Sequence, residues 1–393
     1  MRAGALRRAA DACLVLTAWS IPLSTTGMEV GAAGLGLLAL AAALRGEPVM
    51  LRTPLDTVLG VAAAVLLLST LASGRPLQAG PGWLKLWIVV TYFGVYWWLA
   101  DTRAALAFVR ALLLAASVAA AYGIVQHFTG IDWYHGLLGR PGYVHPRIEG
   151  AEGYASVGFF RNYLTYAHVL VVALGFALAA GGTRAVATSG LLILALLFST
   201  ARGAWLAAAT MLAILAIARR QTAVRVGLVG AGLVLACALS PGWRAQILPS
   251  LTEGETNAGR LAIFATNLDI IHEHPVFGLG FGRYQAAAQP YYDRHPAADR
   301  RSHAHNNFLQ MAAEAGLAGL AAFVLVFATA IRFGVEAVRR ARDPDTQSAA
   351  FGGCLALTGF LVGGLTQYTF GDAEVAIAMW AALAVLMRLR DAS

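Results

Sequence analysis

The sequence predicts an all-α, polytopic integral membrane protein with about twelve transmembrane helices and one large non-cytoplasmic loop that contains an amphipathic helix. The 393 residues are 58% hydrophobic and 13% charged, and soluble proteins carry roughly 25% charged residues. Apolar runs recur along the chain, each long enough as a helix to cross a hydrocarbon layer of roughly 30 Å. The short loops between them are rich in arginine, which is typical of cytoplasmic loops.

Helices are the expected spanning elements because backbone groups inside the hydrocarbon layer must be hydrogen-bonded within the protein. The first apolar run follows Arg7 and Arg8 and resembles a secretory signal. We expect it to be retained, since no clear cleavage site precedes a soluble domain. Loop signals place the spans at 9–26, 28–44, 55–72, 83–100, 104–127, 160–180, 185–200, 203–218, 222–240, 306–333, 347–367 and 374–388.

The arginine distribution predicts that both termini are cytoplasmic. With this orientation, the net charge of +8 sets the topology and does not indicate a nucleic-acid partner. The three cysteines lie in apolar runs, where we expect small core residues and no metal or redox site. The basic residues that become cytoplasmic are Arg2, Arg7, Arg8, Arg45, Arg52, Arg103, Arg110, Arg184, Arg219, Arg220, Arg225, Arg332, Arg339, Arg340, Arg342, Arg388 and Arg390.

Two loops, at 128–159 and 241–304, are far longer than the others, and long ordered loops are usually functional. The second loop divides the chain into helices 1–9 (1–240), a loop domain (241–304) and helices 10–12 (305–393). Apolar positions in 257–274 predict an amphipathic helix, capped by Thr256 or Asn257 and closed by Pro275. The glycines of GLGFG at 278–282 predict a tight turn that returns the loop to the bundle.

Four arginines on the non-cytoplasmic side stand where apolar segments begin or end. Paired N–H donors of a guanidinium bind phosphate oxygens, so these positions suit a lipid diphosphate. Snorkelling to the interface, or pairing with ordinary lipid phosphate, is the alternative for each of them. The four residues are Arg147, Arg161, Arg202 and Arg260.

The segment from Arg300 to Leu320 changes abruptly from basic and polar to apolar. Ser302 is the predicted N-cap, which places His303 and His305 in the first helical turn. The positive helix end disfavours imidazolium, so a histidine there stays neutral and able to act as a general base. Alternatives are a capping role, or a metal site with His295, although no cysteine or carboxylate cluster completes a ligand set.

Several motifs together resemble the O-antigen ligase and polymerase superfamily of bacterial envelope glycosyltransferases. They lie between about 158 and 320, and the plan of twelve spans with a large loop before the tenth agrees with that family. The motifs are GFFRNYLTYAH, STARGAW, the GR of 259–260 followed by the amphipathic helix and HPVFGLGFGRY, and HAHNNFLQMAAEAGLAG.

The resemblance implies an inner-membrane enzyme that transfers a glycan from undecaprenyl diphosphate to an acceptor on the periplasmic face. In the ligases the acceptor is the lipid A core oligosaccharide, and neither a metal nor another cofactor is required. Besides these two substrates, the expected partners are membrane lipids, and nucleic acid is not among them.

Carried onto this sequence, the resemblance makes His305 the catalytic base, with His303 as the alternative. Arg161, Arg202 and Arg260 match the family's diphosphate-binding arginines, whereas Arg147 is included on position alone. The expected reaction inverts the configuration of the transferred sugar.

Three other functions remain open. An O-antigen polymerase would use a second lipid-linked glycan as acceptor, and a protein O-oligosaccharyltransferase would use a protein. The compact chain, without a large C-terminal soluble domain, argues against many protein-glycosylating relatives. A lipid-linked glycan flippase would also need boundary arginines, but it would show internal repeats or broken helices, which the sequence does not indicate.

Overall fold

The computed structural model describes residues 2–49, 52–145, 153–241, 243–244, 254–298 and 303–392. Two predicted residues, Arg147 and Ser302, lie outside these ranges. Within them every regular element is a helix, and the one β-bridge joins His145 and Ala155.

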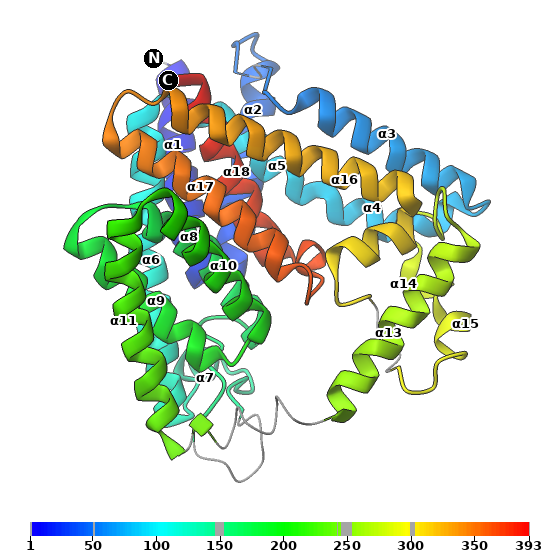
Figure 1. Cartoon of the computed structure of the whole chain (residues 1–393). Helices are drawn as coiled ribbons and strands as arrows, with labels where there is room; N and C mark the ends of the chain where they lie inside the picture. Colours follow the sequence, from blue (N-terminus) through cyan, green and yellow to red (C-terminus); the bar gives the residue numbers. More distant parts are fainter. Residues whose placement is uncertain are drawn as a thin grey trace.

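Figure 1 shows the helices in chain order from blue to red. They are α1 (Arg2–Leu23), α2 (Thr25–Ala43), α3 (Asp56–Ala72), η1 (Pro76–Ala79), α4 (Gly80–Lys85), η2 (Leu86–Val89), α5 (Val90–Trp98), α6 (Thr102–Thr129), α7 (Trp133–Leu137), α8 (Tyr163–Ala179), α9 (Gly182–Ser199), α10 (Arg202–Ala218), α11 (Arg220–Leu239), α13 (Gly254–Glu273), α14 (Tyr284–Ala287), α15 (Gln289–Tyr292), α16 (Asn307–Arg340), α17 (Pro344–Gly363), η3 (Thr369–Gly371) and α18 (Ala373–Ala392).

Helical structure is present at each of the twelve predicted spans, which confirms an all-helical chain of the polytopic membrane type. In the described ranges, six helices are long and apolar enough to cross a membrane: α2, α6, α9, α11, α16 and α17. Three more, α3, α8 and α10, are apolar but shorter. The number of crossings and the side of the large loop stay predictions.

Two predicted spans are broken, contrary to the expectation of uninterrupted helices. The segment predicted at 83–100 is divided into α4, η2 and α5. A Cβ on Gly82 of α4 would meet the Cα of Gly282 at 2.2 Å, so the returning loop lies directly against this segment. The sequence argument against a transporter, which relied on unbroken helices, is therefore weakened.

The second break is in α16, where Gly316 has φ 72° and ψ −177°. Segment 275–279 fits into this break. The amide of Leu317 donates to the carbonyl of Pro275 at 2.8 Å, and the amide of Leu279 donates to the carbonyl of Ala313 at 3.0 Å. Backbone groups that lose their helical partners are thus satisfied by the loop.

The loop itself folds as predicted into a helix and a glycine turn. Helix α13 ends at Glu273, two residues before Pro275, but it begins at Gly254, so the predicted caps Thr256 and Asn257 lie inside the helix. Three glycines of the 278–282 turn have positive φ angles, between 62° and 97°. Side chains of α13, α14 and α15 form a second small core with Ala313 of α16.

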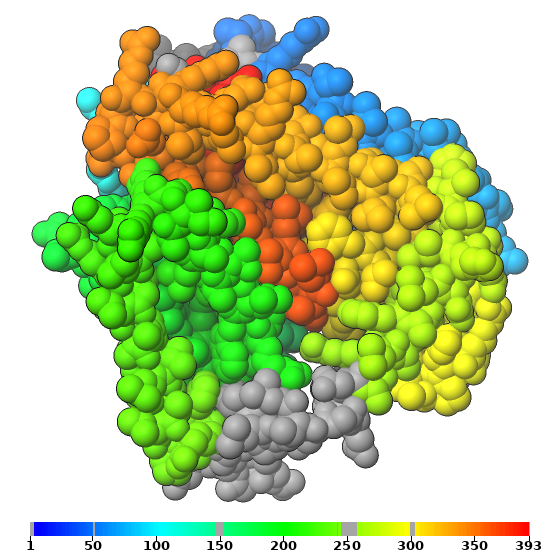
Figure 2. All heavy atoms as spheres, viewed as in Figure 1, coloured from blue at the N-terminus to red at the C-terminus, as the bar shows by residue number. Residues whose placement is uncertain are grey.

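Helices α8, α17 and α18 form the centre of the bundle and are buried on nearly all sides. Such helices are apolar all round because no face meets solvent. In Figure 2 the turn between α17 and α18, in orange-red, lies at the surface between the green helices and the yellow loop helices. This turn holds the candidate site.

Candidate functional site

The site begins where two asparagines fix the start of α16 to the α17–α18 turn. Asn306 is the N-cap: its side-chain oxygen accepts from the first amides of the helix, and its Nδ2 donates to the carbonyl of Leu365 at 2.9 Å. The backbone amide of Asn307 donates to the carbonyl of Gly364 at 2.7 Å, and its Nδ2 donates to Oγ1 of Thr369 at 2.9 Å. The residues before α16 are therefore held against 364–369.

The predicted cap at Ser302 is wrong, since α16 begins only at Asn307. His303 and His305 precede the helix and are not in its first turn. Asn306 is the better cap because it reaches two helix amides and the α17–α18 turn at once. His305 adopts the left-handed conformation, with φ 50°.

This backbone conformation brings the two imidazoles into contact, with ring centroids 4.3 Å apart. Nδ1 of His305 lies 2.8 Å from Oε1 of Gln367. The backbone amide of His305 donates to Nδ1 of His303 at 3.3 Å, and the ring of Tyr368 lies 5.7 Å from that of His303.

These contacts assign different tautomers to the two neutral rings. An amide oxygen only accepts, so Nδ1 of His305 carries its proton and Nε2 carries the lone pair. Nδ1 of His303 accepts, so the proton of this ring is on Nε2. His305 is thus arranged to take a proton, whereas His303 is arranged to donate a hydrogen bond.

Arg202 is the first residue of α10, and α10 starts against the same turn. Thr200 ends α9 with φ 59°, which reverses the chain immediately before Arg202. The next residue, Gly203, packs so closely on Thr366 that a Cβ would meet Thr366 Oγ1 at 1.9 Å. Since Thr366 precedes Gln367, the helix start that carries Arg202 adjoins the residue that holds His305.

Arg161 stands before Asn162, the N-cap of α8, and is exposed to solvent. Its guanidinium lies 5.9 Å from the ring centroid of Tyr143. The amide of Tyr143 donates to Oδ2 of Asp132 at 2.9 Å, and this buried carboxylate also lies 2.8 Å from Nδ1 of His135. Asp132, His135 and Tyr143 of the first long loop therefore form a hydrogen-bonded cluster beside Arg161.

Arg260 lies near the start of α13 and is half-buried. Helix α13 packs against α16, and Ile263 and Ile270 of α13 belong to the same buried cluster as Ala313 of α16. The structure therefore brings His303, His305 and the start of α10, which carries Arg202, together at the α17–α18 turn. Arg161 lies beside this turn, and Arg260 lies on α13, an adjacent element. Arg147 is among the residues that the structure does not describe.

A cavity of about 570 Å³ opens beside these residues. His303, Gln367 and Asn162 line it, so one histidine, the glutamine that holds His305 and the α8 start that follows Arg161 face the same space. Most of the polar groups in the wall of this cavity were not identified from the sequence, although acidic and amide side chains at the ends of apolar spans could have indicated them. These are Lys85, Trp87, Gln285, Gln310, Glu314, Gln367, Tyr368, Asp372 and Glu374.

Two of the acids in this wall have defined partners. Glu314 is 7% exposed, and its carboxylate accepts from the amide of Gly282 at 2.8 Å and from Nε2 of Gln310 at 2.9 Å. Asp372 accepts a hydrogen bond from Thr165 Oγ1 at 2.5 Å. Burial, together with the neighbouring Glu374 carboxylate, raises the pKa of Asp372 to about 7.

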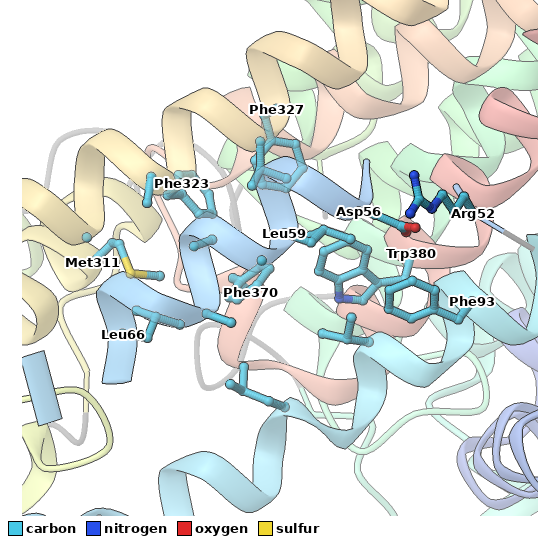
Figure 3. Close-up of a pocket in the computed structure, with 18 of the residues that line it drawn as sticks. Arg52, Asp56, Leu59, Leu66, Phe93, Met311, Phe323, Phe327, Phe370 and Trp380 are labelled. Carbon is cyan, nitrogen blue, oxygen red and sulfur yellow. The ribbon is translucent and has the colours of Figure 1, made fainter. Parts of the chain in front are cut away.

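A second cavity, of about 590 Å³, adjoins the first and is almost wholly apolar. Leu86 and Phe370 line both cavities. Figure 3 shows side chains of α3, α5, α16 and α18 around the apolar space, with Arg52 and Asp56 at one edge. An apolar cavity that meets a polar one suits an amphipathic molecule.

Comparison with known proteins gives one family. The family model described as O-antigen ligase matches residues 187–324, from α9 into α16. This stretch includes Arg202, Arg260, His303 and His305, and it confirms the resemblance that the motifs indicated. No curated protein matches the chain.

Proposed function

We propose, on the premise that residues 187–324 form an O-antigen ligase family domain, that this chain joins O-antigen polysaccharide to the lipid A core. Ligase- or polymerase-type glycosyl transfer is the activity that the family supports. The finer proposal is that the donor is linked to undecaprenyl diphosphate, that the acceptor is a core sugar, and that the reaction occurs at the periplasmic face of the inner membrane. Both termini are then cytoplasmic.

The observation that carries the proposal is the contact between His305 Nδ1 and Gln367 Oε1 at 2.8 Å. It leaves the lone pair on Nε2, the state that a general base needs. In the proposed step, Nε2 accepts the proton of an acceptor hydroxyl while the hydroxyl oxygen attacks the anomeric carbon of the donor. The new carbon–oxygen bond forms as the bond to diphosphate breaks, with inversion of configuration.

The leaving diphosphate takes the electron pair, and arginines stabilise its charge. Arg161, Arg202 and Arg260 are the proposed ligands, with Arg147 as a fourth on position alone. Each charge-assisted contact contributes roughly 1.5–3 kcal/mol. A positioned base contributes a factor of roughly 10² to 10⁴. Because diphosphate is a good leaving group, the proposed mechanism assigns no step to a metal or other cofactor.

The experiment is reconstitution of the full chain in liposomes with an undecaprenyl diphosphate-linked glycan and lipid A core, in the presence of chelator. Glycan on lipid A supports the ligase. Elongated undecaprenyl-linked glycan would instead make the chain a polymerase, and glycan on an added acceptor protein would make it a protein O-oligosaccharyltransferase. Movement of the donor across the bilayer without any covalent product would indicate a flippase.

Replacing His305 by alanine should abolish transfer while leaving the yield of folded protein unchanged. His303→Ala should retain part of the activity, since that ring donates a hydrogen bond and does not take the proton. If His303→Ala abolishes transfer and His305→Ala does not, the assignment of the base is reversed.

A further inference from the structure

Part of the wall of the polar cavity is not used in the proposed transfer step. Lys85, Trp87, Gln285, Asp372 and Glu374 contribute to it. Trp87 is 38% exposed, so an aromatic face is presented among carboxylates and an amide. The side chains of this part of the wall differ from the arginines of the site, which would bind anionic groups.

The two acids are held in place by threonines of neighbouring helices. Thr165 of α8 donates to Oδ2 of Asp372, and Thr25 of α2 donates to Oε1 of Glu374 at 3.2 Å. Oδ1 of Asp372 is buried and accepts no hydrogen bond from any residue in the described ranges. A buried acceptor without a donor is costly, so a donor from a bound molecule would stabilise this part of the wall.

We propose that this wall binds the acceptor sugar, as an uncharged or amino sugar, and excludes phosphorylated groups. The inference rests on the proposed function and divides the site into two parts. Sugar hydroxyls donate to Asp372 and Glu374, and the apolar face of the ring packs on Trp87. A phosphate in this position would lie near one cation, Lys85, but also against two carboxyl groups, so the donor diphosphate binds on the arginine side.

Placement of the acceptor here is consistent with the histidine geometry. His303 lines the cavity and contacts His305, so a sugar bound beside Trp87 and Glu374 lies in the same cavity as His303. Inversion requires the acceptor hydroxyl and the leaving diphosphate to lie on opposite sides of the anomeric carbon. A sugar site separate from the arginines is compatible with this requirement.

The test is calorimetric titration of the full chain, in lipid nanodiscs, with a dephosphorylated core oligosaccharide. Glu374→Gln should weaken binding about ten-fold or more, which corresponds to the loss of a charge-assisted hydrogen bond. Trp87→Ala should weaken it to a similar extent. The phosphorylated core should bind the wild type less tightly than the dephosphorylated core, and Glu374→Gln should reduce that difference.

Two matched variants serve as controls. Trp19 of α1 is also 38% exposed, so Trp19→Ala removes an equally exposed tryptophan far from the cavity. Asp345→Asn removes a carboxylate that is 74% exposed. Neither should change binding. If Glu374→Gln fails to fold, the binding measured for Trp87→Ala tests the proposal alone. Trp87 is partly exposed, so its replacement leaves the fold less disturbed.

Absence of oligosaccharide binding, or equal binding by wild type, Glu374→Gln and Trp87→Ala, overturns the proposal. So does a transfer assay in which these variants raise the KM of the lipid-linked donor and leave the KM of the acceptor unchanged.

Binding with the expected losses but no transfer would refute the proposed function and support the sugar site. Transfer with unchanged acceptor KM in both variants would refute the sugar site and leave the proposed function intact.

Discussion

The imidazole of His305 and the side-chain amide of Gln367 are joined by a 2.8 Å hydrogen bond between positions 62 residues apart in the chain. One residue precedes α16 and the other follows α17. The bond fixes which nitrogen of His305 carries the proton, and it also fixes the plane of the ring. Gln367 is thus the positioning residue for the proposed base.

Gln367→Ala should reduce kcat roughly ten-fold, because the loss of one hydrogen bond of about 1.4 kcal/mol leaves the ring less well oriented. The KM for either substrate should change little. Gln347→Ala, on an exposed glutamine at the start of α17, is the matched control. An unchanged kcat in Gln367→Ala would mean that the bond has no role in orienting the base.

Gln367→Glu gives a second readout that a purely structural role would not produce. A carboxylate at this position favours the protonated imidazole of His305. The acidic limb of the pH–rate profile should therefore move to higher pH. A profile at the wild-type position would contradict the assignment of His305 as the titrating base.

Gly203→Ala should displace the start of α10, because the added Cβ would lie 1.9 Å from Thr366 Oγ1. Overpacking of this kind costs about 1–3 kcal/mol. We expect a rise of about ten-fold in the KM of the lipid-linked donor, since Arg202 moves with the helix start. Thr366→Ala in the same chain removes the hydroxyl and should restore part of the loss.

Gly232→Ala is the control for this pair, because no atom lies within 4 Å of a Cβ at that position of α11. Donor KM should stay at the wild-type value in this control. A donor KM that is unchanged in Gly203→Ala, or no rescue by Thr366→Ala, would show that the contact between α10 and the turn does not position Arg202.

The helical segments were predictable because apolar length is fixed by the hydrocarbon thickness and needs no knowledge of partners. The start of α16 was not, since Ser302 and Asn306 are both good caps and only the carbonyl of Leu365, distant in sequence, favours Asn306. The role of Gln367 could not be predicted either, because its contact with His305 also joins residues that are distant in sequence. Asp372 and Glu374 precede an apolar span, a position that equally suits acids in ordinary solvent-exposed loops.

Gly316→Ala should destabilise the fold, because φ 72° with ψ −177° is unfavourable for any residue with a Cβ. The added atom would also lie 2.1 Å from the carbonyl oxygen of Val276, which is backbone and has little room to move. A loss of at least about 1–3 kcal/mol is expected, seen as a lower unfolding temperature in detergent. Gly60→Ala in α3 meets no atom within 4 Å and should be neutral or stabilising.

Equal unfolding temperatures for Gly316→Ala and wild type would show that α16 can close into a continuous helix. The loop segment at 275–279 would then lose its place in the break. Limited proteolysis of the loop in both variants distinguishes a local release of this segment from general unfolding.

Asp372→Asn should change how stability depends on pH. The carboxyl has a pKa of about 7 in the folded chain, whereas the value in the unfolded chain is about 3.9. A folded pKa above the unfolded one contributes stability that is complete below about pH 3.9 and is lost as the pH rises through 7. The wild type should therefore be less stable at pH 8 than at pH 5, by at most about 3 kcal/mol, because only the roughly two pH units between 5 and the folded pKa contribute in this range.

The carboxyl of Glu374 lies beside Asp372, and Lys85 and His303 line the same cavity, so the comparison with Asp372→Asn is needed to isolate the contribution of Asp372. Asparagine cannot ionise, and Asp372→Asn should reduce the loss between pH 5 and pH 8 while keeping the bond from Thr165. Thermal unfolding in detergent across this range measures the effect, with Asp345→Asn as the exposed control. If Asp372→Asn keeps the wild-type slope, the Asp372 carboxyl is already charged at pH 5, and burial beside Glu374 does not hold a proton on it.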